Sequence, residues 1–145
     1  MNLAAPKPGS VIRYAYLWAG EDTRGRNEAR KDRPALVLAI SVRTDEGTTQ
    51  VMVLAITHSQ PADPSDAIAI PPAVKRLLGL DSTASWIVTT EANGFIWPGP
   101  DVRPVPNRRP VTVIYGQIPA KLLSQVAKSY LANRARQQSR FISRS

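Results

Sequence analysis

The chain has 145 residues, of which 43% are hydrophobic, and this combination indicates one domain with its own core and excludes a disordered protein. It has no cysteine and a single histidine, which excludes a disulfide framework and a zinc site built from these residues. The net charge of +8 is uneven, because residues 1–101 carry 10 Lys/Arg and 11 Asp/Glu, whereas residues 102–145 carry 9 Lys/Arg and no acid. This excess favours a polyanion or an acidic protein as partner, although a solvated basic tail has the same composition.

The sequence contains no sign of a membrane segment. No apolar run approaches the roughly 20 residues that span a bilayer, and the N-terminal segment has no apolar stretch typical of a secretory signal. We therefore expect a cytoplasmic protein without a membrane partner.

The first half of the chain predicts strands. Residues 10–18 are rich in β-branched and aromatic side chains and predict a first strand, followed by a long, charge-dense loop over residues 19–32. Two apolar runs, 35–40 and 51–56, predict buried strands joined by a turn at 44–48.

The middle of the chain predicts short elements. Residues 67–70 and 85–90 are strand candidates, and residues 71–79 predict a short helix with prolines at its start and Gly79 at its end. A turn with aromatic residues is expected at 95–100, and a last strand at 112–115.

A helix is predicted from Pro119 to about Gln137. Its apolar stripe consists of residues spaced by four: Leu122, Val126 and Tyr130 beside Leu123, Ala127 and Leu131. The elements together predict a mainly β fold, a strongly curved antiparallel sheet or small barrel with a short helix and a C-terminal α-helix. We assign residues 1–138 to this single domain and residues 139–145 to a basic tail.

The two apolar runs also predict a site. If they pair as a hairpin, Arg33 lies near Thr57, His58 and Ser59, and a guanidinium beside hydroxyls and a histidine is typical of a phosphate site. Alternatives stay open. Arg33 could pair with Asp32 or a loop acid, Thr57 could only bond the turn, and His58 could be a solvated loop residue. Strand alternation sets Thr57 and His58 on opposite sides unless the strand end twists.

The order of these motifs resembles the MazF/PemK toxin endoribonucleases of type II toxin–antitoxin modules. The resemblance runs from about residue 8 to residue 133, and its most specific parts are Arg33-Pro34 with the apolar run behind them and Thr57 downstream. The stretch from Trp86 to Trp97 and residues 116–119 are similar to the PemK-like growth inhibitors. Two departures are Ala55, where the family often has proline, and the longer first loop.

The resemblance implies an SH3-like barrel, a homodimer and metal-independent cleavage of single-stranded RNA such as mRNA, without a cofactor. It also implies a cognate acidic antitoxin whose partly disordered tail lies along the RNA groove. Arg33 and Thr57 match the family's catalytic arginine and its partner threonine. Further candidates for catalysis or RNA positioning are His58, Ser59, Glu21 and Glu28, and candidates for RNA binding are Arg24, Arg26, Arg30, Lys31, Glu91 and Asn93.

The implied chemistry suits the residues present. RNA is cut when its own 2′-hydroxyl attacks the adjacent phosphate, and a protein accelerates this by orienting the backbone, moving protons and stabilising the charge of the phosphorane. No metal is needed in this route. Two alternatives are a non-catalytic RNA-binding or regulatory module with the same barrel and, more weakly, a gyrase poison, because CcdB toxins share the barrel but end in Trp-Gly-Ile.

Overall fold

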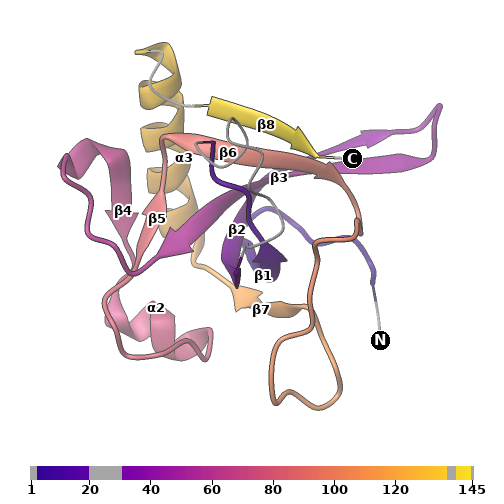
Figure 1. The fold of residues 1–145 in the computed structure, drawn as a ribbon, viewed down its shortest axis with the longest axis horizontal. Helices are drawn as coiled ribbons and strands as arrows, with labels where there is room; N and C mark the ends of the chain where they lie inside the picture. The colour runs from indigo at the N-terminus through magenta and orange to yellow at the C-terminus, as the bar shows by residue number, and fades with distance from the viewer. Residues whose placement is uncertain (1–2, 20–30, 137–139, 145) are drawn as a thin grey trace.

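The computed structural model describes residues 3–19 and 31–136, and residues 140–144 as backbone (Figure 1). The strands are β1 (Ser10–Ala15), β2 (Asp32–Arg43), β3 (Thr48–Thr57), β4 (Ala67–Ala69), β5 (Trp86–Val88), β6 (Glu91–Ile96), β7 (Ile114–Gln117) and β8 (Arg140–Arg144). The helices are the 3-10 turn η1 (Pro64–Asp66), the short α2 (Pro72–Leu77) and α3 (Ala120–Ala135).

The strands form one branched sheet. Its main order is β4-β5-β3-β2-β1-β7, in which every neighbouring pair is antiparallel, and β6 lies antiparallel to part of β3 while β8 runs parallel to β6. The described strands do not close into a ring, because β4 and β7 end the order. The predicted mainly β, antiparallel fold with a C-terminal helix is therefore confirmed.

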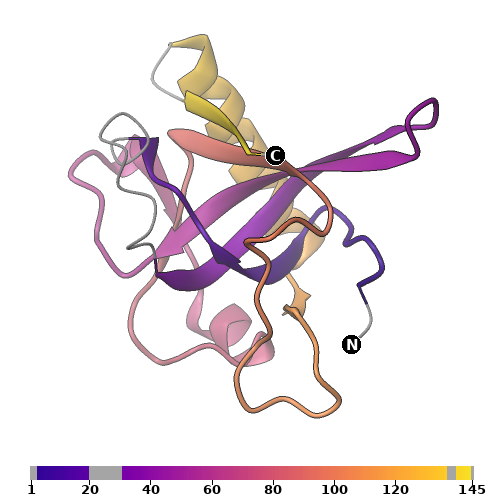
Figure 2. The ribbon, with the colours of Figure 1, turned by 45° about the vertical axis from the view of Figure 1, so that its right-hand side comes forward.

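The hairpin of β2 and β3 is the centre of the sheet. Its inner halves are almost wholly apolar, and Leu36, Val37, Val53 and Leu54 are fully buried. The outer end of the hairpin projects beyond the other strands (Figures 1 and 2). The turn predicted at 44–48 is confirmed, because β2 ends at Arg43 and β3 begins at Thr48.

The core lies on both faces of the sheet, as alternating side chains require. On one face, side chains of β2, β3 and β5 pack with α2 and α3: Leu36, Leu54, Ile87, Leu78, Leu122 and Val126. On the other, β1 and β6 contribute to a cluster that includes Ile12, Tyr14, Val37, Val53 and Phe95. The predicted row Leu122, Val126, Tyr130 of α3 is buried, whereas Leu131 is 63% exposed. No helix among residues 3–19 and 31–136 is long and apolar enough to cross a membrane.

Two strands were not expected from the sequence. The aromatic segment 95–100 was predicted as a turn, yet β6 reaches Ile96 because its residues pair with β3 on one side. The tail predicted at 139–145 contains β8, whose backbone pairs with β6 on the other side. Part of the segment assigned to the tail thus contributes a strand to the sheet.

Candidate functional site

Arg33 and Thr57 come together at the inner end of the central hairpin. The β2–β3 register pairs Ala35 with Ala55. Arg33 and Thr57 lie two residues beyond this last pair of the ladder, at corresponding positions of the two strands, and residues at corresponding positions of antiparallel strands point to the same face. Both residues are half-buried. Both residues also line the same hollows, so the structure brings them to one place.

Two hollows meet at this pair. One, of about 370 Å³, is lined by Lys31, His58, Lys75, Asp81 and Ser85 among others. The second, of about 410 Å³, is lined by Trp18, Gln60, Pro61, Asp66 and Val88 among others. Arg33, Thr57 and Ser59 line both. We call the two hollows together the Arg33 groove, with these three residues at its middle.

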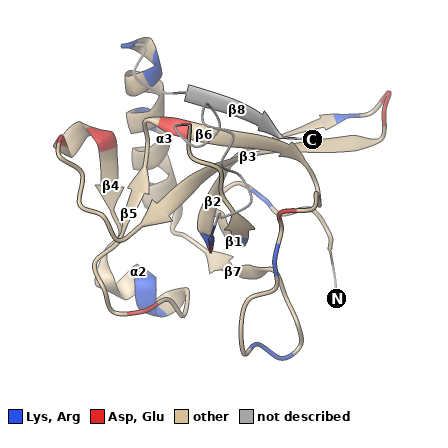
Figure 3. Ribbon diagram, in the orientation of Figure 1, with Lys and Arg blue, Asp and Glu red and all other residues tan. Residues whose placement is uncertain are grey.

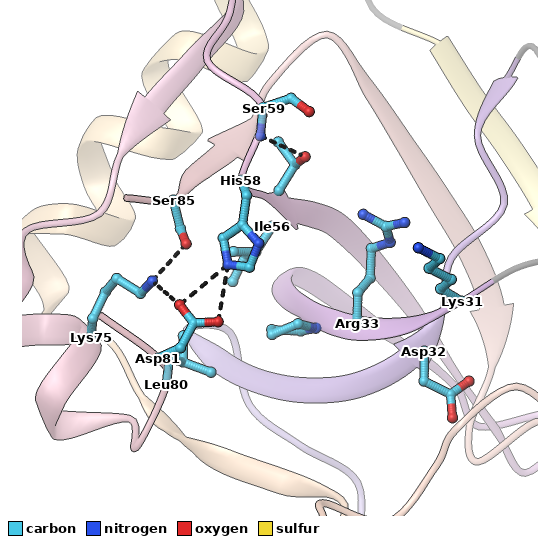
Figure 4. Close-up of a pocket in the computed structure, with 12 residues that line it drawn as sticks. Lys31, Asp32, Arg33, Ile56, His58, Ser59, Lys75, Leu80, Asp81 and Ser85 are labelled. Carbon is cyan, nitrogen blue, oxygen red and sulfur yellow. Dashed lines mark hydrogen bonds and ion pairs between the residues drawn. The ribbon is translucent and has the colours of Figure 1, made fainter. Parts of the chain in front are cut away.

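Arg33 lies against Trp18. The guanidinium carbon is 5.2 Å from the centroid of the indole ring, within the range of a cation–π contact. The carboxylate of Asp32 points to the other side of β2 (Figure 4) and pairs with Arg13 at 3.9 Å and Arg103 at 3.4 Å. Asp32 is therefore not the partner of Arg33, and the loop acids considered as its other partner lie outside the described residues.

Thr57 has a local structural role beside its place in the groove. Its Oγ1 accepts a hydrogen bond of 3.1 Å from the backbone N–H of Ser59, which fixes the bend after β3. A threonine hydroxyl that accepts one bond still has its own proton to donate. Thr57 can therefore hold the bend and contact a bound anion together.

His58 reaches the same groove as Thr57 because β3 ends between them. Past the end of the strand, alternation no longer dictates the side of the sheet on which a side chain lies. The His58 Nε2 atom is 3.2 Å and 3.1 Å from the two carboxylate oxygens of Asp81, and its side chain is 57% exposed. His58 is thus held by an acid rather than only by solvent.

A buried lysine anchors that acid. Lys75 of α2 is 4% exposed, and its ammonium donates to Asp81 Oδ1 at 2.8 Å, to Ser85 Oγ at 2.7 Å and to the carbonyl of Thr83. The backbone N–H of Thr83 also donates to Asp81. The hydrogen bond from Lys75 is the main cause that lowers the pKa of the Asp81 carboxyl below its usual value. Asp81 is therefore ionised at neutral pH (Figure 4).

The end of α2 explains why Lys75 and Asp81 meet. Gly79 has a φ of +67°, and the N–H groups of Gly79 and Leu80 donate to the carbonyls of Arg76 and Lys75. This is the pattern of a Schellman cap, which reverses the chain after a helix. The sequence indicated the glycine stop, but nothing in the spacing connected residues 75 and 81 to His58, so sequence analysis missed both.

The remaining candidates differ in where they lie. Lys31 lines the first hollow. Glu21, Arg24, Arg26, Glu28 and Arg30 lie outside the described residues.

Glu91 and Asn93 do not line either hollow. The Asn93 amide is fully buried, and it donates to the Leu17 carbonyl at 2.8 Å and accepts from the Leu17 N–H at 2.9 Å. Glu91 accepts from the Tyr16 hydroxyl and the Ala19 N–H. Burial raises the pKa of Tyr16, so this hydroxyl keeps its proton. The Asn93 amide is thus used inside the fold, and Glu91 holds the segment after β1.

The basic residues of the last third are spread over the fold. Those of residues 102–136 lie in the long segment before β7 and along α3, at separate places (Figure 3), and neither hollow is lined by a residue of 102–136. Among the described residues, three cations line the groove: Lys31 just before β2, Arg33 in β2 and Lys75 in α2.

Comparison of the chain with models of known protein families gives no match, and comparison with curated proteins gives no relative. The function is therefore argued from the groove itself.

Proposed function

We propose that this protein is a metal-independent endoribonuclease of the MazF/PemK kind that cleaves single-stranded RNA in the cytoplasm. The observation that carries the proposal is the placement of Arg33 and Thr57 on opposite strands, at the middle of one open groove. A planar guanidinium and a hydroxyl that line the same groove are suited to bind a phosphate.

The proposed roles follow from the chemistry of RNA cleavage. Arg33 binds the non-bridging oxygens of the scissile phosphate and stabilises the extra charge when the 2′-oxygen attacks. The Thr57 hydroxyl donates a hydrogen bond to the phosphate and so fixes the orientation of the phosphate. The hollows on the two sides of the pair provide room for the nucleotides before and after the cleaved bond.

The wider proposal concerns the module to which the protein belongs. We propose that the curved, open sheet is a partly open SH3-like barrel and that the chain acts as a homodimeric toxin which inhibits growth. A cognate acidic antitoxin would neutralise it, because a groove with Lys31 and Arg33 suits carboxylates as well as phosphates.

The test is cleavage of a long, mixed-sequence single-stranded RNA by the purified protein. We expect shorter products from the wild-type chain, and Arg33→Ala to lower the rate about 100- to 1000-fold. Arg43→Ala is the matched control, because Arg43 lies at the other end of β2 and pairs with Glu46. DNA of the same sequence, which lacks the 2′-hydroxyl, stays intact.

Two results would contradict the proposal. A wild-type protein that shifts the RNA in a gel without shortening it would be a binding module. Equal cleavage by wild type and Arg33→Ala would remove Arg33 from the site. Circular dichroism of each variant shows whether the fold is kept.

A further inference from the structure

Three side chains form a linked series along one wall of the first hollow. The buried Lys75 holds Asp81, and Asp81 holds His58, through contacts of 2.8 Å and 3.1 Å. They come from α2, the loop after it and the end of β3, so the tertiary fold alone brings them together (Figure 4). His58 is the one histidine of the chain and the one side chain whose ordinary pKa lies near neutrality.

The carboxylate sets the state of the imidazole ring. Asp81 accepts at Nε2, which favours the neutral ring with its proton on that nitrogen and leaves Nδ1 as a proton acceptor. That second nitrogen faces the side of the hollow on which Arg33 lies (Figure 4). A proton acceptor therefore faces the place where the proposed function puts the phosphate.

Lys75 makes this arrangement rigid. Its ammonium has three acceptors around it and almost no exposed surface, and the Thr83 N–H holds the same carboxylate oxygen. A carboxylate fixed by two donors keeps one orientation toward the ring, as a base needs when it must meet a substrate hydroxyl. A solvated loop histidine would need no such support.

We propose that His58 is the general base of the cleavage reaction and that Asp81, anchored by Lys75, is its positioning residue. This inference rests on the proposed function. The Nδ1 atom takes the proton of the 2′-hydroxyl while the 2′-oxygen bonds to phosphorus and the bond from phosphorus to the 5′-oxygen breaks. The departing 5′-oxygen takes a proton from water. The products are a 2′,3′-cyclic phosphate and a 5′-hydroxyl, and the exposed imidazolium returns its proton to solvent.

Charges of both signs surround this base. Asp81 and Lys75 face it from the loop after α2 and from α2, and Lys31 and Arg33 line the same hollow. Asp32 also borders the hollow, but its carboxylate pairs with Arg13 and Arg103 on the other side of β2. The carboxylate of Asp81 stabilises the imidazolium that forms, and the cations oppose it. A general base acts only in its unprotonated form, so we expect the cleavage rate to rise with pH.

The first test compares cleavage by wild type, His58→Gln and Arg76→Ala across pH 5 to 8, the range of histidine titration. We expect His58→Gln to lower the rate about 100- to 10,000-fold and to abolish the rise with pH. Its affinity for an RNA with a 2′-deoxy nucleotide at the mapped cut stays that of wild type. Arg76, exposed on α2 and absent from both hollows, is the matched control.

The second test measures the effect of Asp81 on the protonation of the His58 ring. Because the chain has one histidine, its ¹⁵N resonances identify the ring's protonated nitrogen without assignment. We expect the Nε2–H form to dominate in wild type, and Asp81→Asn to lose that preference together with cleavage rate. A residue that only stabilises the fold would leave the ring's preferred form unchanged.

The outcomes separate this inference from the proposed function. If Arg33→Ala abolishes cleavage while His58→Gln cleaves at the wild-type rate with the wild-type pH profile, the base is not His58 and the nuclease proposal stands. If the wild-type chain cleaves no RNA, both proposals fall.

Discussion

Asp32 and Arg33 are neighbours in the chain, but their side chains lie on opposite sides of β2 (Figure 4). The cause is the alternation of a strand, which separates adjacent residues onto two faces. Asp32 joins Arg13 and Arg103, while Arg33 joins Thr57 in the groove. Asp32 thus pairs with the two arginines away from the groove, and Arg33 lines the groove.

The cations Lys31 and Arg33 in the groove predict a salt-dependent affinity for RNA. Each phosphate contact releases bound counterions, so the logarithm of the affinity falls linearly with the logarithm of salt concentration. We expect Lys31→Ala to reduce the slope by about 1. Arg43→Ala leaves it unchanged, because at ~3.3 Å per residue Arg43 lies roughly 30 Å from Arg33 along β2. Fluorescence anisotropy over a salt series measures both, and equal slopes for wild type and Lys31→Ala would place Lys31 outside the contact.

Thr57 predicts a difference between two small substitutions. Thr57→Ser keeps the hydroxyl and retains cleavage, whereas Thr57→Val keeps the volume and loses the donor. A hydrogen bond to a charged group contributes about 1.5–3 kcal/mol, so Thr57→Val lowers the rate about 10- to 100-fold. Single-turnover cleavage at saturating protein measures this. Both variants melt near the wild-type temperature, since water replaces the bond to the exposed Ser59. Equal cleavage rates for Thr57→Val and Thr57→Ser would show that Thr57 only holds the turn after β3 and does not contact the phosphate.

Asp81 predicts a loss of stability in acid. The Lys75 ammonium holds the pKa of Asp81 below its usual value of 3.8. A carboxyl whose pKa is lowered by folding stabilises the folded state above its unfolded pKa, and this contribution is lost as pH falls through the lowered value. We therefore expect the melting temperature of wild type to fall more steeply below about pH 4 than that of Asp81→Asn.

A part of the acid sensitivity remains in Asp81→Asn. The backbone N–H of Ser65 likewise lowers the pKa of Asp63, and that group is unchanged in the variant. Melting curves collected from pH 7 to pH 2 test the comparison. Parallel curves for the two proteins would show that Lys75 does not hold an ionised Asp81.

The hairpin and its site were predictable because both follow from local pattern. Two apolar runs with one turn set the register, which ends with Ala35 opposite Ala55, and Arg33 and Thr57 follow two residues beyond that pair. His58 was not predictable in the same way. Alternation placed it across the sheet from Thr57, and only the position at which β3 ends decides otherwise.

The remaining contacts depend on tertiary packing. Lys75 meets Asp81 through a helix cap, and Asp81 meets His58 through the packing of that loop on β3. The strand β6 was hidden because Gly94 and Pro98 are typical turn residues, yet Gly94 lies opposite Met52 inside the sheet. An asparagine in a buried strand is also unusual, and its partner is a backbone group that no side-chain pattern reveals.

That asparagine gives the last prediction. Asn93→Ala leaves the buried N–H and carbonyl of Leu17 without their partner, and each such group costs about 1–3 kcal/mol. We expect urea unfolding to show that the free energy of unfolding falls by at least the cost of one such group. The affinity of the folded variant for RNA stays that of wild type. The control is Gln125→Ala. Gln125 is exposed on α3 and alanine has a high helix propensity, so this variant keeps the wild-type stability. A variant with intact stability and weakened RNA binding would instead return Asn93 to the RNA interface, and with it the segment after β1 that Asn93 holds in place.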